Sequence, residues 1–260
     1  ASSFSSEADL TKYGYSFIPR GFTLAAYKYI WAIKENILRA YGMSFLITGI
    51  GTVINLVMTL LFAYPLSRKD LSGRKWISFF LFFTMLFNGG FVPTYLIYSN
   101  VFHITDTLIV PYLLMNAFYV IMMRTYIMTN VPMEVIEASM IDGANEFQNL
   151  ARIVVPMSKP IIGTIGLMSA IAYWNNWTNG IYFIQSRRNL YGIQNYLNSV
   201  ISNVAFLQTH SVGSGIVTAD LPSISIRMAL AVIAIIPVLV AYPFFQKSFV
   251  AGITVGSVKG

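Results

Sequence analysis

The 260-residue chain is 56% hydrophobic and only 10% charged, whereas soluble domains carry roughly 25% charge, so a soluble globular protein is excluded. The net charge is +7, but the basic residues are not clustered with aromatic residues on a polar face, which argues against nucleic-acid binding. Cysteine is absent, and the two histidines, His103 and His210, lie far apart outside the hydrophobic runs. We therefore expect an all-α membrane domain without a disulfide or a His or Cys metal site.

The N-terminal residues 1–42 are polar and precede the first long hydrophobic run. Their first ten residues lack the basic start and apolar core of a signal peptide. Residues 23–41 carry apolar side chains in a mixed, amphipathic pattern, which predicts a helix lying in the membrane interface. We therefore interpret 1–42 as a separate segment that contains one interfacial helix.

Five hydrophobic runs follow, each long enough to cross a bilayer as a helix. They comprise residues 43–66, 76–98, 107–127, 160–180 and 226–245. Asn88, Gly89 and Gly90 interrupt the second run, and such breaks are tolerated in membrane helices because neighbouring groups satisfy the freed backbone. Residues 43–260 are therefore expected to form one polytopic transmembrane helical bundle.

The loops between these runs differ in positive charge, which indicates their side of the membrane. The 67–75 loop carries four basic residues and is expected in the cytoplasm, whereas the 99–106 loop has no Lys or Arg and is expected outside. Alternation then places 130–160 inside and 181–225 outside. It also places 1–42 outside, in spite of its five basic residues. Because an external N-terminus without a signal peptide is unusual, we expect a further span upstream, giving six in all.

The polar stretch 130–160 stands out between two hydrophobic runs. It holds four of the ten acidic residues, Glu134, Glu137, Asp142 and Glu146. Ile136 and Met140 are i,i+4 neighbours on one short helix, Gly143 interrupts the pattern, and a second helical pattern includes Phe147. The stretch therefore predicts helix, Gly bend, helix at a membrane surface. An ordinary amphipathic loop accounts for the pattern equally well.

The spacing within this stretch resembles the cytoplasmic signature of permease subunits of binding-protein-dependent ABC importers. The signature reads Glu-Ala-Ala, three residues, Gly, nine residues, Ile, one residue, Leu-Pro. The matching residues are Glu137-Ala138-Ser139, Gly143, Ile153 and Val155-Pro156, with Ser and Val replacing Ala and Leu. Residues 89–95, 123–125 and 252–260 are similar to the oligosaccharide and polysaccharide branch, which includes maltose and alginate importer permeases. The resemblance extends from about residue 43 to the end.

The resemblance implies a bundle of the type I importer kind, in a bacterial inner or plasma membrane. It implies four partners: cytoplasmic ATPase subunits, a second and different permease, an extracellular solute-binding protein, and a carbohydrate substrate. The chain lacks the Gly-x-x-x-x-Gly-Lys-Ser/Thr phosphate loop. We therefore expect a non-catalytic subunit without cofactors, with ATP and Mg held by the ATPase.

The helix–Gly–helix stretch is, by this resemblance, the coupling segment that docks on the ATPase. Apolar Ile136, Met140 and Phe147 suit anchors in a groove, Glu137 suits an ion pair, and small residues allow close approach. A simple helix bend remains the alternative for Gly143. The expected docking residues are Glu134, Ile136, Glu137, Ala138, Ser139, Met140, Asp142, Gly143, Ala144 and Phe147.

An aromatic and amide-rich run, 173–179, suggests a sugar path, because ring faces and amide groups match sugar rings and hydroxyls. The alternative is an aromatic belt at the membrane interface. Buried polar residues in the other spans are weaker candidates, since they also join helices. The path candidates are Asn88, Asn116, Tyr119, Tyr173, Trp174, Asn175 and Trp177.

The 181–225 segment is expected, from the resemblance, to reach toward the binding protein. The candidates for that contact are Arg187, Arg188, Tyr191 and Asn195. The two arginines suit an acidic glycan or an acidic rim of the binding protein, although a solvated basic turn explains them as well.

Two other classes of function compete with an ATP-driven importer. An ion-coupled secondary transporter usually has ionisable residues within its spans, and here Arg124 and Arg227 lie near span ends. A membrane enzyme needs paired carboxylates, a His cluster or a Ser/His/Asp arrangement, and the spans contain none of these. The residues therefore favour the importer.

Overall fold

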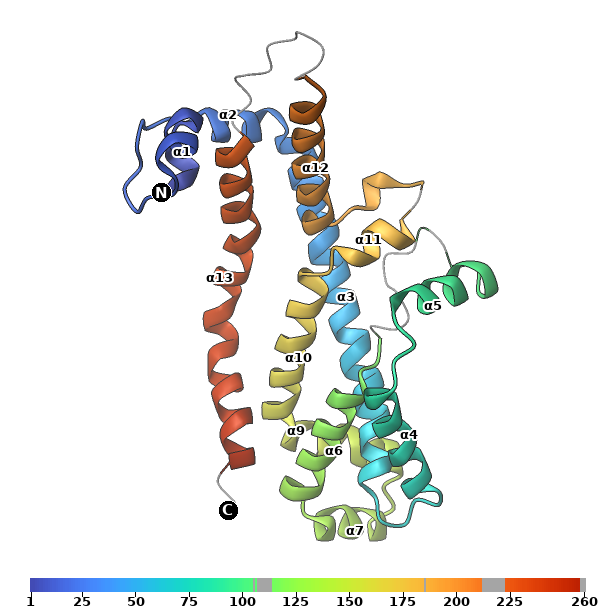
Figure 1. The fold of residues 1–260 in the computed structure, drawn as a ribbon. Helices are drawn as coiled ribbons and strands as arrows, with labels where there is room; N and C mark the ends of the chain where they lie inside the picture. Colours follow the sequence, from blue (N-terminus) through green and yellow to red (C-terminus); the bar gives the residue numbers. More distant parts are fainter. Residues whose placement is uncertain (105, 107–113, 185, 212–222, 258–260) are drawn as a thin grey trace. The chain divides into compact units, whose positions relative to one another are not determined.

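A computed structural model describes residues 1–104, 106, 114–184, 186–211 and 223–257. All regular elements in this part of the chain are helices (Figure 1). The chain divides into two compact units, Ala1–Leu46 with Asn175–Ala241 and Ile47–Trp174 with Tyr242–Gly260. Two long helices, α3 (Lys34–Ser67) and α13 (Ser223–Ser257), contribute residues to both units.

The first unit contains the N-terminal helices and the segment that follows residue 174. Its elements are a 3₁₀ turn Ser2–Phe4, α1 (Glu7–Tyr13), α2 (Ala25–Ala32), the start of α3, α11 (Thr178–Phe183), a 3₁₀ turn Arg188–Leu190, α12 (Ile193–Ser211) and most of α13. Ser6 caps α1 by accepting a hydrogen bond from the Asp9 amide. The Glu7 carboxylate accepts from the Ile224 amide at 2.9 Å, so it caps the first turn of α13.

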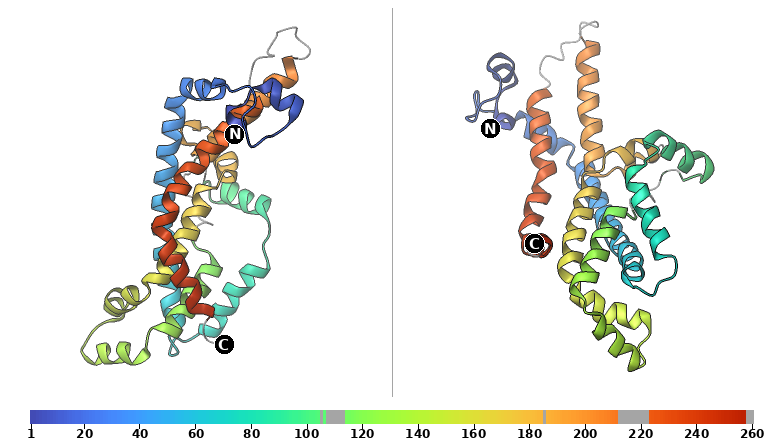
Figure 2. Two further views of the ribbon diagram at one scale, coloured as in Figure 1. Left: turned by 90° about the vertical axis from the view of Figure 1, so that its left-hand side faces the viewer. Right: turned by 60° about the horizontal axis from the view of Figure 1, so that its bottom comes forward.

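The second unit contains the remaining helices. Its elements are the rest of α3, α4 (Arg74–Leu86), α5 (Phe91–Leu96) with a π-helical turn Ile97–Val101, α6 (Ala117–Asn130), α7 (Met133–Ile141), α8 (Glu146–Asn149) with a π-helical turn Leu150–Val154, α9 (Val155–Met157) and α10 (Lys159–Trp174). α6 packs against α4 and α10. α7 turns away from the axis of α6 and runs crosswise at the end of this unit (Figures 1 and 2).

The core of the second unit is formed where α3, α6 and α10 meet the coupling segment. Ala63, Val120, Met123, Val154 and Ile165 are completely buried in one cluster. Only 17% of the most apolar stretch of α3 is buried inside the protein, however. Most of the surface of this stretch is therefore apolar and not covered by other parts of the chain. A helix that is apolar all round belongs in lipid or against other membrane helices.

The expected spans are reproduced as helices to different degrees. α3 contains run 43–66 and is the one helix in the described residues that is long and apolar enough to cross a membrane unaided. Two bent pairs, α4 with α5 and its π turn (115°) and α8–α9 with α10 (82°), raise the number to three if each counts as one span. Run 226–245 lies within α13, of which Ile224–Val240 is counted as a shorter apolar helix.

Two expected spans differ from the structure, and part of a third is outside it. Run 76–98 is not one straight helix, because extended Phe87 and Gly90 at φ +89° make a corner between α4 and α5 (Figure 2). The helix of run 160–180 ends at Trp174. Residues 107–113 of run 107–127 lie outside the described residues, and α6 covers 117–127.

The expected interfacial helix 23–41 is helical but divided. α2 ends at Ala32, and α3 starts at Lys34 and continues into the first apolar run. Ile30, Ile37 and Ala40 are buried. The apolar side of this stretch therefore packs within the protein, so the amphipathic pattern reflects internal packing as well as an interface.

Candidate functional site

The coupling segment begins with α7, and a glycine lies just after the end of this helix. The Gly143 amide donates to the Met140 carbonyl and the Ala144 amide to the Ser139 carbonyl, both at 3.0 Å. This hydrogen-bond pair is a Schellman motif, which requires a left-handed residue at the position of Gly143. Gly143 has φ +85°, where a side chain is disfavoured. The bend expected at Gly143 is therefore present as a defined helix stop.

The second helix of the segment begins immediately with its own cap. Asn145 and Gln148 form a capping box, with hydrogen bonds of 2.9 and 2.8 Å between each side chain and the other residue's amide. The Ser139 hydroxyl also donates to the Asn149 side chain at 2.7 Å, and Asn149 is completely buried. α7 and α8 are thus joined by a short corner that is held by backbone and side-chain hydrogen bonds.

The end of α3 is tied to this corner by a polar cluster. Arg68 lies 3.1 Å from Asp70 and 3.5 Å from Glu146, and its side chain is only 10% exposed. The Tyr64 hydroxyl donates to the same Glu146 carboxylate. The hydrogen bond from Arg68 lowers the pKa of the exposed Asp70 carboxyl. We call Tyr64, Arg68 and Glu146 the α3–α8 link.

A cavity of about 390 Å³ lies beside the α3–α8 link. Its wall includes the link itself and the apolar side chains Leu61, Phe147 and Leu150. Phe147 is 70% exposed, so an apolar ring stands at the edge of a partly polar hollow. Such a combination suits a protein partner with an apolar anchor and a polar rim.

Most of the expected docking residues are accessible on the segment. Glu134, Glu137, Ala138, Met140, Asp142, Gly143 and Phe147 are exposed, and Ser139 and Ala144 are partly so. Ile136 is the exception, because it is 3% exposed, belongs to the core cluster and is not accessible to a partner in this structure.

The outward apolar positions of α7 are instead Val135 and Ile141, which are 44% and 87% exposed. The pattern located an apolar stripe, but a stripe alone does not say whether it faces the core or a partner. The α3–α8 link was also not anticipated. Four cations in the 67–75 loop indicated orientation only, and no local spacing connects Arg68 with Glu146.

The path candidates in the second unit have structural partners. Asn88 accepts a hydrogen bond from the Gly90 amide, and Asn116 caps α6 by accepting from the Phe118 amide, both at 2.9 Å. Tyr119 is partly buried against the core. Tyr173 and Trp174 are 5% and 6% exposed at the end of α10.

Tyr173 packs directly on α3. A Cβ atom built on Gly51 would lie 2.5 Å from Cζ of the Tyr173 ring, so the ring occupies the space that a side chain would need. Gly51 itself is buried. The small residue therefore allows close approach of helix and ring.

The remaining candidates belong to the first unit. Asn175 is exposed and accepts a hydrogen bond from Gln194 at 3.4 Å, and Trp177 is 48% exposed. Asn195 is 5% exposed and donates to the Trp177 carbonyl. Asn195 was expected at a protein contact, whereas in this structure its amide packs against Gly180 inside the unit. Arg187 and Arg188 are exposed, and Tyr191 is partly exposed.

A cavity of about 470 Å³ in the first unit collects polar side chains from α3, the Arg188–Leu190 turn and α12. We call it the arginine–amide pocket. It is lined by Asn36, Arg39, Ala40, Arg188, Asn189, Tyr191, Tyr196, Ser199, Ser202 and Asn203. This lining holds two guanidinium groups, three amides, two hydroxyls and two phenols, and no carboxylate. Guanidinium and amide groups of this kind bind carboxylates and hydroxyls.

Long apolar helices joined to a crosswise helix–Gly–helix segment are typical of a membrane protein. Comparison with known proteins identifies the family. The chain belongs to the binding-protein-dependent transport system inner membrane components, whose pattern matches residues 46–255. It is therefore a membrane permease subunit and not a catalytic enzyme.

Two proteins of Bacillus subtilis (strain 168) are similar along the whole chain. Protein LplC is 36% identical over 265 residues, covering 100% of this chain and 87% of the relative. The polygalacturonan/rhamnogalacturonan transport system permease protein YtcP is 36% identical over 264 residues, covering 100% and 90%. The relatives include permease components of carbohydrate import systems.

A solved structure has the same fold. It is the crystal structure of a bacterial ABC transporter involved in the import of the acidic polysaccharide alginate. The match has a TM-score of 0.78 and 28% identity and covers 95% of this chain and 87% of that chain. The predominantly helical architecture is therefore that of an importer permease.

Proposed function

We propose that this chain is one permease subunit of an ATP-driven importer that takes up acidic oligosaccharides delivered by an extracellular binding protein. The observation that carries the proposal is the hydrogen-bonded helix–Gly–helix corner, which presents apolar side chains outward and is tied to the end of α3. A docking element is useful for coupling only if it is both accessible and firmly connected to the spans.

The coupling segment is proposed to dock on a separate ATPase subunit, which would hold ATP and Mg. Phe147, Ile141 and Met140 are the exposed anchors, and Glu134, Glu137 and Asp142 are exposed acids available to basic groups of the partner. When the ATPase subunits close, α7 is displaced. The Schellman motif, the capping box and the α3–α8 link keep the corner from deforming, so the displacement passes to α3.

The arginine–amide pocket and a similar solved structure support the proposed substrate class. On the topology expected from loop charges, this pocket lies on the outer side. Arg39 lines it from α3 and Arg188 from the Arg188–Leu190 turn, and a guanidinium pairs well with a sugar carboxylate. The alginate importer supplies an acidic precedent among similar structures.

The remaining assignments complete the proposal. A second, different permease would pair with this chain, and both would lie in the bacterial inner membrane with the coupling segment in the cytoplasm. Trp177 and Asn175 are exposed and remain path candidates, whereas Tyr173 and Trp174 serve packing in this conformation. Arg187 and Tyr191 remain candidates for the binding-protein contact.

Uptake by reconstituted vesicles tests the proposal. The complete complex is placed in proteoliposomes with its loaded binding protein outside and ATP inside. We expect uptake of a uronate oligosaccharide to stop without ATP and to continue after a protonophore collapses the proton gradient. Uptake that needs the gradient and ignores ATP would instead establish an ion-coupled secondary transporter.

A further inference from the structure

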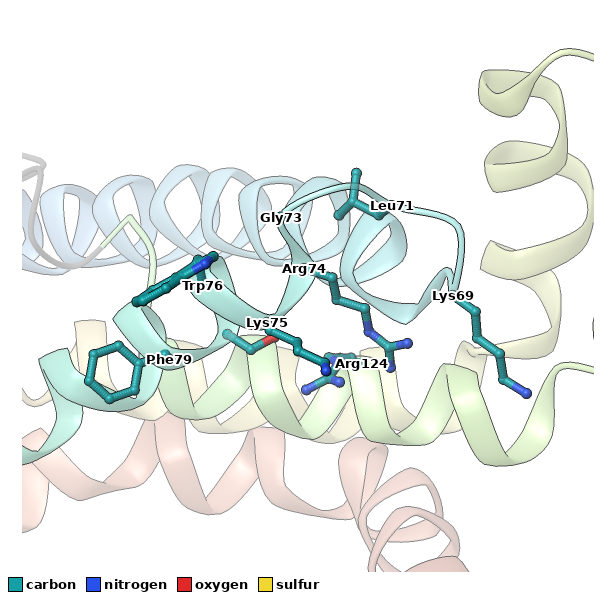
Figure 3. A pocket seen from close by; sticks show the side chains of 9 residues that line it. Lys69, Leu71, Gly73, Arg74, Lys75, Trp76, Phe79 and Arg124 are labelled. Carbon is teal, nitrogen blue, oxygen red and sulfur yellow. The ribbon is translucent and has the colours of Figure 1, made fainter.

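A second polar hollow lies in the second unit, and its lining is strongly basic (Figure 3). Its volume is about 800 Å³. The wall comes from the loop after α3, the start of α4 and one residue of α6. The lining residues are Lys69, Leu71, Gly73, Arg74, Lys75, Trp76, Ser78, Phe79 and Arg124.

The four cations of this pocket are not neutralised by the protein. In the described part of the chain, none of Lys69, Arg74, Lys75 and Arg124 lies within 4.0 Å of a carboxylate oxygen. The neighbouring acid, Asp70, is paired with Arg68 at 3.1 Å. Arg124 is held in place by donating from Nε to the Leu66 carbonyl at 2.9 Å, which leaves its terminal nitrogens for a ligand.

Two of these cations occupy an electrostatically unfavourable position. Arg74 and Lys75 are the first residues of α4, where the positive end of the helix dipole favours anions. The first turn contains no acidic residue, and its cap, Gly73, has no side chain to satisfy the free amides. Loop orientation explains basic residues in this loop, but it does not explain why Arg124 of α6 faces the same hollow. An anionic ligand would balance the charges of Arg74 and Lys75, accept hydrogen bonds from the free amides of α4 and account for the position of Arg124.

The aromatic side of the pocket indicates what kind of anion fits. Trp76 and Phe79 are 73% and 55% exposed, and Trp is enriched at the headgroup level of membranes. α4 continues beyond them with exposed Phe80 and Phe83, so its outer surface is apolar and suited to lipid. The basic groups therefore lie directly next to a surface for acyl chains.

We propose that this pocket binds the phosphate headgroup of an anionic phospholipid of the cytoplasmic leaflet. Arg74, Lys75 and Arg124 contact the phosphate, Lys69 adds charge, and Trp76 packs beside the glycerol and first acyl carbons. Basic pockets between helices on the cytoplasmic side have the chemistry for such headgroups. The side of the membrane rests on the orientation proposed above. Free phosphate shares the chemistry of the headgroup but lacks the acyl chains.

Quenching of Trp76 fluorescence by lipids brominated in the acyl chain tests the site on the purified full-length chain in detergent. The Trp76 signal is the difference between wild type and Trp76→Phe. We expect phosphatidylglycerol to quench it at roughly tenfold lower mole fraction than phosphatidylcholine. Arg74→Gln with Arg124→Gln should abolish that preference, whereas Lys12→Gln with Arg20→Gln, which removes equal charge elsewhere, should retain it.

Further measurements distinguish the lipid from inorganic phosphate and from a protein partner. If the double variant does not fold, Lys75→Gln with Lys69→Gln is used, because both side chains are exposed. Equal quenching by the two lipids, or displacement of phosphatidylglycerol by millimolar inorganic phosphate, would overturn the proposal. Complete displacement by added ATPase subunit would also overturn it and assign the pocket to a protein contact. None of these measurements requires transport, so they stand apart from the uptake experiment.

Discussion

Arg68, the first residue after α3, lies 3.5 Å from Glu146, at the start of α8. The same carboxylate accepts a hydrogen bond from Tyr64, one turn earlier on α3. Arg68 also contacts the sulfurs of Met133 and Met140 at 3.9 and 3.7 Å, so it reaches both helices of the coupling segment. The end of the long apolar helix α3 and the proposed docking element are thereby joined through Tyr64 and Arg68.

Breaking this ion pair should weaken coupling more than stability. Glu146 is 51% exposed, and such partly exposed pairs contribute only about 1 kcal/mol or less. In Glu146→Gln we therefore expect a small decrease in melting temperature but more ATP hydrolysed per sugar imported, because α8 is less firmly connected to α3. Coupling is measured in proteoliposomes as the ratio of ATPase rate to uptake.

Glu35→Gln is the matched control for the link, because Glu35 is exposed on the first turn of the same helix α3. It removes the same charge at a distance from the coupling segment. An unchanged ATP-to-sugar ratio in Glu146→Gln would show that the α3–α8 link does not carry coupling.

Truncation of Phe147 should weaken ATPase binding. An interface anchor contributes roughly 2 kcal/mol or more, which corresponds to about 30-fold in affinity. Because Phe147 is 70% exposed, we expect Phe147→Ala to leave the melting temperature of the isolated chain nearly unchanged. Affinity is measured by titrating purified ATPase onto the permease pair. Phe17→Ala, at a fully exposed ring in the N-terminal segment, should bind normally, and equal affinity in both variants would contradict docking at Phe147.

A side chain at Gly143 should distort the corner by strain and not by collision. A Cβ there would meet nothing within 4 Å, but φ is +85°. A left-handed residue with a side chain costs roughly 1–2 kcal/mol, and Asn tolerates the conformation best. We expect Gly143→Val to lower both ATPase binding and thermal stability, with Gly143→Asn in between.

Gly42→Ala controls for the loss of a glycine, since Gly42 lies in α3 with open space and ordinary φ. It should behave as wild type or slightly better. The same effect from Asn and Val at position 143 would argue against backbone strain as the cause.

Adding a methyl group at Gly51 should destabilise the second unit. Its Cβ would lie 2.5 Å from the buried Tyr173 ring, and overpacking of this kind costs roughly 1–3 kcal/mol. We expect Gly51→Ala to lower the melting temperature in detergent, and Tyr173→Leu in the same chain to restore part of it. Gly49→Ala, on the same helix with open space, should have no such effect. Equal melting temperatures for the two glycine variants would contradict the contact.

Neutralising the arginine–amide pocket should discriminate against acidic sugars. We expect Arg39→Gln with Arg188→Gln to reduce uptake of a uronate oligosaccharide by tenfold or more, since each lost charge-assisted hydrogen bond is worth roughly 1.5–3 kcal/mol. Uptake of a neutral oligosaccharide of equal length should change little. Lys28→Gln, an exposed cation of the same unit outside the pocket, is the control. An equal loss for both sugars would mean that the arginines hold structure or the binding protein.

The sequence by itself determined the membrane class, the helical character of the apolar runs and the position of the helix stop at Gly143. These features depend on composition and on short-range spacing, which a chain carries whatever its tertiary structure. The helix stop at Gly143 could be predicted because a Schellman motif is a local hydrogen-bond pattern.

Only the tertiary structure decided which face of each helix is used. An apolar residue suits a core and a partner equally well, so Ile136 was expected outside but lies in the core, whereas Ile141 is exposed. Likewise, an amide suits a surface contact and an internal hydrogen bond, and Asn195 forms the latter. The α3–α8 link and the four-cation pocket join residues distant in sequence, and such proximity is set by helix packing and not by any local pattern.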